Sequence, residues 1–395
     1  ALDIATKTFG PDHPYTLRVE YEMEIAEIRG SSLEDVANLV QRLKAAVGSD
    51  HPDTLADMEV LGSRQTDEGL LNEALATSQF VLSARIRALG KDHREVAKAQ
   101  SFLAQDLAGL DRYEEAIELM KVSIATNERV LGSSSTSAIF GRGNLGTMLL
   151  SSGKIAEPLN NLRDVVEMSK SRFGEGTPPH LIYSSYLAEA EYFSGELQSA
   201  VARSSYAADV LEKIKGRPDM LAGNLERVAR VLVFRRLYQE AYDTLQKAMD
   251  ILKDDDPRDK AIRLRVQVLL DYCGYLLGKR TIDDLRNRIL EQKANAAAKW
   301  SDIATSAAYL ASAYNDLGEP EKSLQVSREA LEKIRKIFPA GHHAMLPLLV
   351  QEVRAALELS DRTKAQEAYQ FGLNIVANTE GLDPRWQQAL KDAVD

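Results

Sequence analysis

The sequence predicts an all-α fold, a solenoid built from tandem pairs of helices. Glycine recurs with a period of 42 residues, at Gly90, Gly132, Gly174 and Gly216. Two further ladders of mostly small residues keep nearly the same period. Self-similarity at a fixed period of about 20 to 50 residues is the signature of repeat architectures. The chain is therefore expected to stack copies of one structural unit.

The two ladders of small residues define that unit. The first has intervals of 42, 42, 42, 41, 44 and 38 and comprises Gly62, Ala104, Gly146, Ala188, Ala229, Cys273 and Ala311. The second follows twelve residues later and comprises Ala74, Ala116, Pro158, Ala200, Ala241, Leu285 and Ser323. Two helices approach to about 8 to 10 Å only where bulky side chains are absent from the crossing. Both ladders are therefore expected where helices pack together.

Each unit is predicted to be a helix, a tight turn and a second helix. Residues 305–318 place their apolar side chains on one broad helical face. Turn residues follow such stretches, and they include Gly153-Lys154, Gly195-Glu196 and Gly318-Glu319-Pro320. Counting second helices gives about nine pairs.

The two ends of the chain depart from this pattern. Residues 1–9 align with the close of a second helix, so we expect them to be the end of a truncated upstream repeat in a fragment of a longer protein. Residues 10–380 are expected to form a single solenoid domain of tandem repeats. Residues 381–395 are expected to supply a capping helix, from about Pro384 to Ala393, that covers the last pair with Trp386 and Leu390.

A second signature, Gly-x-Asp-His-Pro-x-Thr-Leu, stands between units. It is complete at residues 10–17 and 48–55 and is reduced to Gly-Lys-Asp-His at residues 90–93. The glycine is expected to end one helix in a left-handed conformation. The aspartate is expected to cap the next helix, and the proline fits its first turn.

Composition and motif searches exclude several classes of function. The net charge is −10 and no basic block is present, so nucleic acid and anionic membranes are poor candidate partners. No apolar run approaches the roughly 20 residues that a bilayer span requires, and no secretory leader is recognisable. Serine hydrolase elbows, phosphate-binding glycine loops and His-Glu-x-x-His helices are absent. We therefore expect a non-enzymatic protein without a cofactor, located in the cytoplasm.

Histidine and cysteine give no convincing metal site. All six histidines fall in or beside the connections between units. Successive connections in a helical stack lie about 10 Å apart, whereas zinc ligands converge to about 2.1 Å from one ion. We favour the interpretation that the histidines have a structural role at the starts of helices. Only the pair His342-His343 is left as a candidate for binding an ion at the surface. Cys273 occupies a ladder position and is expected to be a small buried packing residue.

The repeat unit resembles the tetratricopeptide repeat. First helices carry Leu followed by a small residue, and turns carry Tyr113 or Tyr238 with Ala three residues later. The 42-residue period and the inter-repeat motif are similar to the longer variant found in kinesin light chains and in bacterial signalling proteins. The resemblance covers essentially the whole chain and implies a right-handed superhelix whose inner wall, lined by first helices, receives an extended peptide or a helix. The chain departs from kinesin light chains in lacking a heptad coiled coil.

This resemblance implies a protein-binding or peptide-binding scaffold. The expected role is the interaction or sensory region of a larger bacterial signalling protein, such as a serine/threonine kinase or a regulator, although no kinase signature lies in this chain. One alternative is a cargo adaptor like kinesin light chains. Another is a structural scaffold that forms homo-oligomers through its end repeats.

The family's groove positions can be transferred to this sequence by their offsets from the first ladder. They give a predicted peptide site made of Lys98, Gln105, Phe140, Asn144, Thr147, Tyr186, Glu189, Arg227, Arg230, Gln267, Tyr309 and Ser312. Its proposed centre combines an amide, an aromatic ring and two guanidinium groups that can pair with a ligand carboxylate, at Asn144, Tyr186, Arg227 and Arg230. A simpler interpretation, which we favour, is that the two arginines only neutralise Glu189 and Glu226.

The aromatic residues near Tyr186 also have two possible roles, packing in the core and contact with a ligand. Tyr183, Tyr192 and Phe193 accompany it at helical spacing, and such residues usually form core. Aromatic residues are also enriched at the centres of binding sites. We expect a split role, in which some of these rings pack and others contact a ligand.

Overall fold

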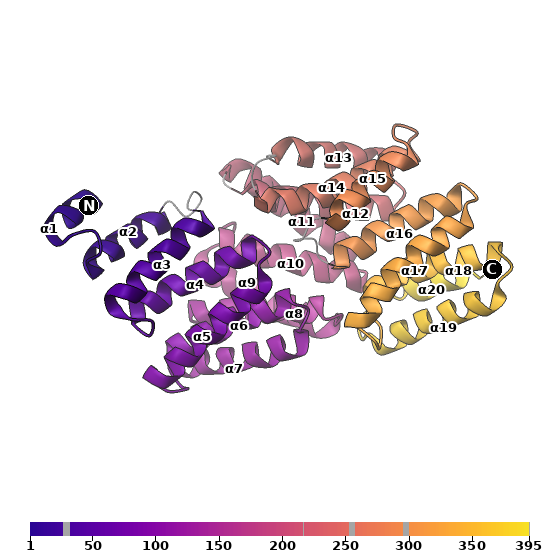
Figure 1. Ribbon diagram of the computed structural model, residues 1–395. Coiled ribbons are helices and arrows are strands. Elements are labelled where there is room, and N and C mark those ends of the chain that lie inside the picture. The colour runs from indigo at the N-terminus through magenta and orange to yellow at the C-terminus, as the bar shows by residue number, and fades with distance from the viewer. Residues whose placement is uncertain (27–31, 216, 253–256, 295–299, 395) are drawn as a thin grey trace. The chain divides into compact units, whose positions relative to one another are not determined.

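The computed structural model describes residues 1–26, 32–215, 217–252, 257–294 and 300–394, and these form two compact units, Ala1–Met148 and Leu149–Asp395. Every regular element in the described residues is helical, as Figure 1 shows. None of these helices combines the length and the apolarity needed to cross a bilayer. The predicted all-α repeat solenoid is confirmed, while the expected domain boundaries stay predictions.

The first unit contains three and a half helical hairpins after a short leading helix. Its helices are α1 (Leu2–Phe9), α2 (Pro14–Ala26), α3 (Leu33–Val47), α4 (Pro52–Asp67), α5 (Leu71–Leu89), α6 (Arg94–Gly109), α7 (Tyr113–Leu131) and α8 (Thr136–Ser151), within which the boundary between units falls. Helices from α1 to α7 contact one another in chain order, and α4 also contacts α6.

The second unit continues the alternation of first and second helices. It contains α9 (Ala156–Phe173), α10 (Pro178–Ser194), α11 (Leu197–Ile214), α12 (Pro218–Phe234), α13 (Tyr238–Ile251), α14 (Pro257–Leu276), α15 (Ile282–Ala294), α16 (Trp300–Asp316), α17 (Pro320–Ile337), the 3₁₀ turn η1 (His343–Met345), α18 (Leu346–Glu358), α19 (Arg362–Asn378) and α20 (Arg385–Asp392). In chain order over the described residues, nine first helices from α2 to α18 alternate with nine second helices from α3 to α19, as the ladders predict.

First helices lie closer together than second helices. In the second unit α10 contacts α12, α12 contacts α14, α14 contacts α16 and α16 contacts α18. Among the described residues, no comparably extensive contact joins successive second helices of this unit. A stack curves toward the side on which its elements are closer, so the first helices form the inner side. We call the first helices of each unit its inner wall.

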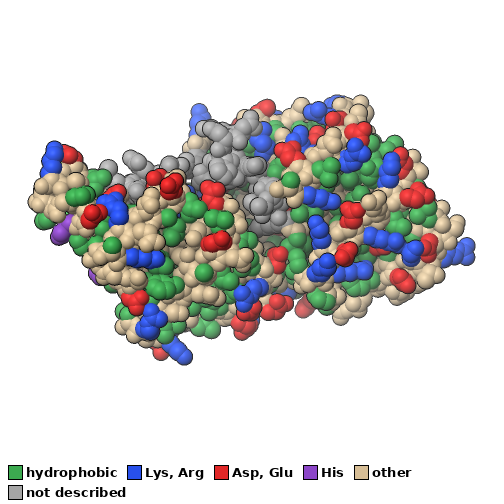
Figure 2. All heavy atoms as spheres, in the orientation of Figure 1, with side chains coloured by type: hydrophobic (Ala, Val, Ile, Leu, Met, Phe, Trp, Pro, Cys, Tyr) green, Lys and Arg blue, Asp and Glu red, His purple; other side chains and the backbone are tan. Residues whose placement is uncertain are grey.

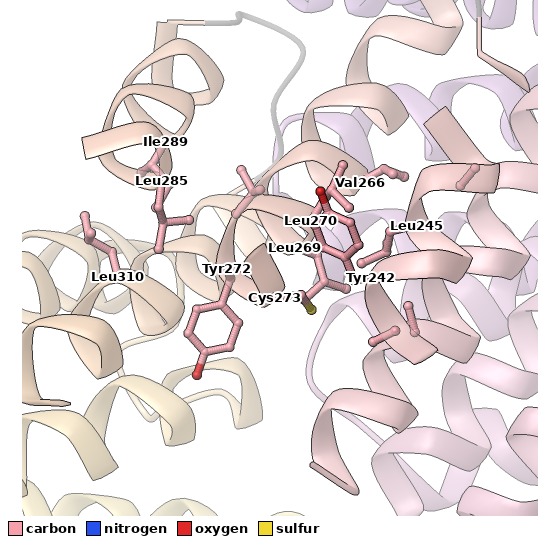
Figure 3. Close-up of a cluster of buried hydrophobic side chains, with 14 of the residues drawn as sticks. Tyr242, Leu245, Val266, Leu269, Leu270, Tyr272, Cys273, Leu285, Ile289 and Leu310 are labelled. Carbon is pink, nitrogen blue, oxygen red and sulfur yellow. The ribbon is translucent and has the colours of Figure 1, made fainter. Parts of the chain in front are cut away.

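The small-residue ladders mark the helix crossings. Ala104, Ala188, Ala229 and Ala311 of the first ladder are fully buried, and so are Ala74 and Ala241 of the second. Cys273 is fully buried as well, and burial raises the pKa of its thiol to about 12, in agreement with a packing role. Figure 3 shows it among apolar side chains from α13, α14, α15 and α16.

The glycines between units take backbone conformations that other residues avoid. Gly90, Gly132 and Gly174 have φ of 76°, 88° and 96°, whereas Gly216 lies outside the described residues. Their ψ values of 165°, 153° and 153° are extended, so the expected left-handed helical conformation is wrong in ψ. This region of positive φ and extended ψ is essentially restricted to glycine. These three positions therefore require glycine, which explains why glycine recurs every 42 residues.

Histidine, and not aspartate, caps the helices that follow the inter-repeat motif. The ring Nδ1 atoms of His51 and His93 accept hydrogen bonds from the backbone N–H groups two residues later. Asp50 and Asp92 instead form exposed ion pairs with arginines near the ends of the preceding second helices, Arg87 and Arg129. The predicted aspartate cap is wrong because histidine occupies the N-cap position, and its Nδ1 lies as many bonds from Cα as the capping oxygen of Asn.

Helix α20 closes the C-terminal end of the second unit. Leu390 is fully buried and contacts the position of Gly372 on α19, where any added side chain would lie within 2.8 Å of it. Trp386 packs partly buried on the same apolar cluster. The helix contacts α18 and α19, the last hairpin, which is the arrangement expected of a cap.

The capping role of histidine can be tested by substitution of His93. His93→Ala should lower the free energy of unfolding by about 1 kcal/mol, because the N–H group of Glu95 loses its acceptor, whereas His93→Asn should retain most of the stability. Urea unfolding followed by circular dichroism measures both variants. The control is Asp92→Ala, which removes only an exposed ion pair and should cost about 0.5 kcal/mol or less. A larger cost for Asp92→Ala than for His93→Ala would contradict the assignment.

Candidate functional site

The inner wall of the first unit exposes the predicted groove residues to solvent. Lys98 on α6 is half exposed, with its ammonium 2.8 Å from Glu59 on α4 and 5.8 Å from the ring centre of Phe102. Gln105 is exposed, and its amide donates back to the carbonyl of its own helix at Ser101. Each of these side chains forms a contact within the first unit and is still accessible to solvent.

Helix α8 contributes three more predicted residues. The side chain of Phe140 is 38% exposed. Asn144 and Thr147 are half-buried, and the hydroxyl of Thr147 donates to the backbone carbonyl of Asn144 at 2.8 Å. The helix thus presents an aromatic side chain and two polar side chains along the wall.

Two buried carboxylates of the first unit were missed by sequence reasoning. Glu59 is bound by Lys98 and, at 2.6 Å, by Arg85. Asp106 accepts hydrogen bonds from the hydroxyls of Ser78 and Thr66. Burial raises the pKa of Asp106, although both hydroxyls oppose this shift. No sequence pattern predicts these two buried carboxylates, because only the packing of α4, α5 and α6 brings their partners together.

The inner wall of the second unit carries a chain of six alternating charges. We call this set the charge chain, and it consists of Arg227, Glu189, Arg230, Glu226, Arg265 and Asp302 from α10, α12, α14 and α16. Glu189 accepts from Arg227 Nε at 2.6 Å and from Arg230 Nη2 at 2.7 Å. Glu226 lies 3.4 Å from Arg230 and 3.4 Å from Arg265, which is 3.7 Å from Asp302.

The charge chain is balanced and largely shielded from solvent. Three guanidinium groups face three carboxylates, and their side chains are between 10% and 29% exposed. Burial opposes the ionisation of Glu189, but the two neighbouring guanidinium groups outweigh it and hold the pKa of this carboxyl well below its usual range. Burial likewise opposes the charge on Arg230, and the carboxylates of Glu189 and Glu226 raise its pKa in spite of it.

This geometry agrees with the simpler interpretation of the two arginines. Arg227 and Arg230 bind Glu189 directly, so they neutralise a carboxylate of the protein itself. A ligand carboxylate would have to displace a short, partly buried pair. The role of these residues in binding a peptide stays a prediction.

The aromatic residues near Tyr186 divide into packed and exposed rings. Tyr183 is buried, and burial raises the pKa of its phenol. The ring of Tyr192 lies under the Arg230 guanidinium at 5.2 Å and contacts Phe193 edge to face. Tyr186 is 39% exposed. Contact of any of these rings with a ligand stays a prediction, and Tyr186 is the most accessible of them.

The remaining predicted positions lie on α14 and α16. Tyr309 stacks on Tyr272 with ring centres 4.6 Å apart, and a hydrogen bond joins Ser312 to the same tyrosine. Burial raises the pKa of Tyr309, and the neighbouring phenol of Tyr192 adds to this shift. Gln267 is half-buried. Of these residues, Tyr309 lies near the charge chain, through Arg230 and Glu226.

His342 and His343 do not form a surface ion site. Both are 4% exposed, and their rings contact each other at 4.2 Å between centres. His342 accepts the N–H of Ala344 and packs against Trp300 and Phe338. Within the described residues, no cluster of three or more histidine, cysteine or acidic side chains is suited to hold a metal ion. The alternative that His342 and His343 bind an ion at the surface is wrong, because the packing of η1 buries both side chains.

Comparison with known proteins agrees with the repeat assignment. The tetratricopeptide repeat model matches residues 96–136 and 303–344, which cover all but the first residues of the hairpins α6–α7 and α16–α17. The search of curated protein sequences gave no match.

Solved structures show the same fold at low sequence identity. A Rap protein complexed with competence and sporulation factor is 11% identical over 86% of this chain and 96% of that one, with a TM-score of 0.61. The Rap conjugation gene regulator of plasmid pLS20, in complex with the Phr* peptide, is 12% identical over 82% and 90%, with a TM-score of 0.59. A signal transduction ATPase with a tetratricopeptide repeat sensor from Pyrococcus horikoshii is 13% identical over 93% and 54%, with a TM-score of 0.50. The chain is therefore a tetratricopeptide-like repeat solenoid.

Breaking the charge chain should destabilise the second unit. Glu189→Gln should lower the free energy of unfolding by about 3 kcal/mol, because it leaves two largely buried guanidinium groups without their carboxylate. The control is Glu196→Gln, which breaks an exposed bidentate pair with Arg163 and should cost about 1 kcal/mol or less. Chemical denaturation measures both. Equal costs would show that the charge chain is no more important than a surface pair.

The buried histidines predict a loss of stability in acid. Burial lowers the pKa of His343 from 6.5 to about 4, so the unfolded chain takes up a proton before the folded one does. This contribution to stability is complete above pH 6.5 and is lost as the pH falls toward 4, by an amount on the order of 3 kcal/mol. His343→Gln should lose less stability than the wild type between pH 7 and pH 5 in urea unfolding. Parallel losses in the two proteins would contradict the assignment.

Proposed function

We propose that this chain is a protein-binding or peptide-binding scaffold that recognises an extended peptide or a helix on its inner wall. The observation that carries the proposal is the exposure of aromatic side chains on rigid first helices. Phe140 on α8 and Tyr186 on α10 are 38% and 39% exposed. Aromatic residues on preorganised helices supply large contact areas at low entropic cost, which is why they dominate binding hot spots.

The polar neighbours of these rings suit recognition of a peptide backbone. Asn144 follows Phe140 by one helical turn, and amide side chains can both donate to and accept from a peptide group. Gln105 on the adjacent first helix is exposed. Mixed positive and negative side chains cover the face seen in Figure 2, with no single-sign field that would favour nucleic acid.

The ligands named for the structural neighbours support a peptide ligand. One Rap protein is complexed with competence and sporulation factor, and another is in complex with the Phr* peptide. In the signal transduction ATPase the repeats are named as a sensor. We propose by analogy that this chain serves as the interaction or sensory region of a larger signalling protein. The attached kinase or regulator, the cytoplasmic location and the absence of enzymatic activity stay predictions.

A matched set of aromatic substitutions tests the proposal. A peptide selected from a phage-displayed random library on the immobilised chain serves as the probe, and fluorescence anisotropy gives its Kd. Phe140→Ala should weaken a peptide that binds the first unit, and Tyr186→Ala should weaken a peptide that binds the second unit, each by about tenfold or more. The controls are Phe80→Ala and Tyr206→Ala, because these rings are 37% and 38% exposed on the second helices α5 and α11. They should change Kd by less than about twofold.

Two outcomes would contradict the inner wall as the binding surface. One is a selected peptide whose Kd responds to the second-helix controls and not to Phe140→Ala or Tyr186→Ala. The other is a chain that yields no peptide and whose mass in light scattering rises with concentration, which would favour the self-associating scaffold.

A further inference from the structure

The C-terminal part of the second unit returns to the turns at its beginning. We call this contact the clasp, and it joins His342–His343 and Thr379–Arg385 to the turns around Gly153 and Gly195. The N–H of Ala156 donates to the carbonyl of Glu380 at 3.1 Å, and the N–H of Asp383 donates to the carbonyl of Phe193 at 3.1 Å. Hydrogen bonds therefore connect the two ends of the unit through the backbone.

Side chains reinforce the clasp. The ring of His343 contacts that of Phe193 at 4.4 Å between centres, and its Nδ1 lies 3.3 Å from the carbonyl oxygen of Gly153, 190 residues earlier. The guanidinium of Arg385 binds the buried carboxylate of Asp383 and lies 4.5 Å from the ring of Phe234 at the end of α12. The C-terminal segment thus spans the ends of several earlier hairpins.

Glycines at the turns leave the space that the clasp fills. A Cβ at Gly195 would lie 2.8 Å from the carboxylate carbon of Asp383, and a Cβ at Gly153 would lie 2.6 Å from the ring of His342. A Cβ at Gly381 would lie 3.1 Å from the backbone of Ala156. Gly318 occupies the turn of the α16–α17 hairpin, which corresponds to that of Gly195, with a similar positive φ of 69° but nothing within 4 Å of its Cβ. Of these two corresponding turns, only that of Gly195 has such a close neighbour.

The inner wall enclosed by the clasp is less accessible than the open wall of the first unit. Lys98, six residues before its ladder alanine, is 52% exposed, whereas Gln267, at the same offset from Cys273, is half-buried. Glu189, Arg227 and Arg230 are between 14% and 19% exposed. Tyr186 on α10 stays 39% exposed, so the shielded part of this wall is the stretch that carries the charge chain and Gln267.

We propose that the clasp is a gate, and that a protein or peptide reaches the charge chain on the inner wall of the second unit only after the clasp releases the turns around Gly153 and Gly195. This inference rests on the proposed function and adds its regulation. The closed arrangement hides the charge chain, so a ligand that binds the wall shifts the unit toward the open state.

The clasp has the composition of a reversible contact. Its links are hydrogen bonds and ring contacts made by loops and helix ends, and the extensive helix contacts of the described second unit join neighbours along the stack. The groups that form such hydrogen bonds can bond to water when they separate, so each link contributes little net stability. The fully buried Leu390 keeps α20 on the last hairpin, so opening at the turns does not require α20 to leave.

Thiol labelling tests the gate without any ligand. A cysteine introduced as Gln267→Cys on α14 reports access to the enclosed wall, and the probe is a maleimide-linked polyethylene glycol too bulky for a closed interior. The native Cys273 supplies little background because it is fully buried with a raised pKa. Gly195→Ala, which forces Asp383 away, should accelerate labelling by about tenfold, as expected for a larger open population.

The matched control is Gly318→Ala, which imposes the same backbone strain at a turn without a clasp neighbour and should leave the labelling rate unchanged. Gln198→Cys on the exposed face of α11 should label at one rate in every background. If Gly195→Ala fails to fold by circular dichroism, Arg385→Ala decides the matter, because it removes the contacts to Gly195 and Phe234 without straining a turn. It too should accelerate labelling.

Equal labelling of Gln267→Cys in the wild type and in the folded clasp variants would overturn the gate. This result is independent of the proposed function, because labelling needs no peptide. If the gate is correct and peptide binding uses this wall, the selected peptide should bind Gly195→Ala more tightly than Gly318→Ala. Accelerated labelling without any peptide binding would retain the gate and reject the binding proposal.

Discussion

The close crossing of helices at the two ladders is the constraint on which the rest of the structure depends. Ala104, Ala188 and Ala229 are fully buried because only a small side chain leaves room for the neighbouring helix. Repeating this crossing at a nearly constant interval places every hairpin beside the next. Since first helices of the second unit also touch one another, the stack within this unit bends toward them.

Inward-facing charges must then be compensated within the wall. Glu189 binds two guanidinium groups from α12, and the alternation continues through α14 to α16. Removing a charge from water is costly unless an opposite charge and hydrogen bonds replace the solvent. The same physical requirement acts on His342 and His343, which burial keeps neutral.

The fold was predictable to the level of individual crossings, because the ladder positions encode contacts between helices that are adjacent along the chain. The capping of the helices was misjudged in one respect: the motif contains both aspartate and histidine, and the distance along the chain to the helix start decides which of them caps. Offsets from the ladder placed Arg227 and Arg230 beside Glu189, since these residues occupy successive first helices. Glu59 with Arg85, and Asp106 with Ser78, were missed because no local pattern distinguishes a buried polar partner from a solvated one.

The sequence by itself determined the repeat and the helical hairpins, because both follow from periodic apolar and small residues within a few tens of positions. Only the tertiary structure decided that the second unit joins its own ends. The pairing of Ala156 with Glu380 and of Phe193 with Asp383 depends on the curvature accumulated over many hairpins. A small change in each crossing angle would separate these groups. No pattern of residues along the chain predicts the curvature that accumulates over many crossings.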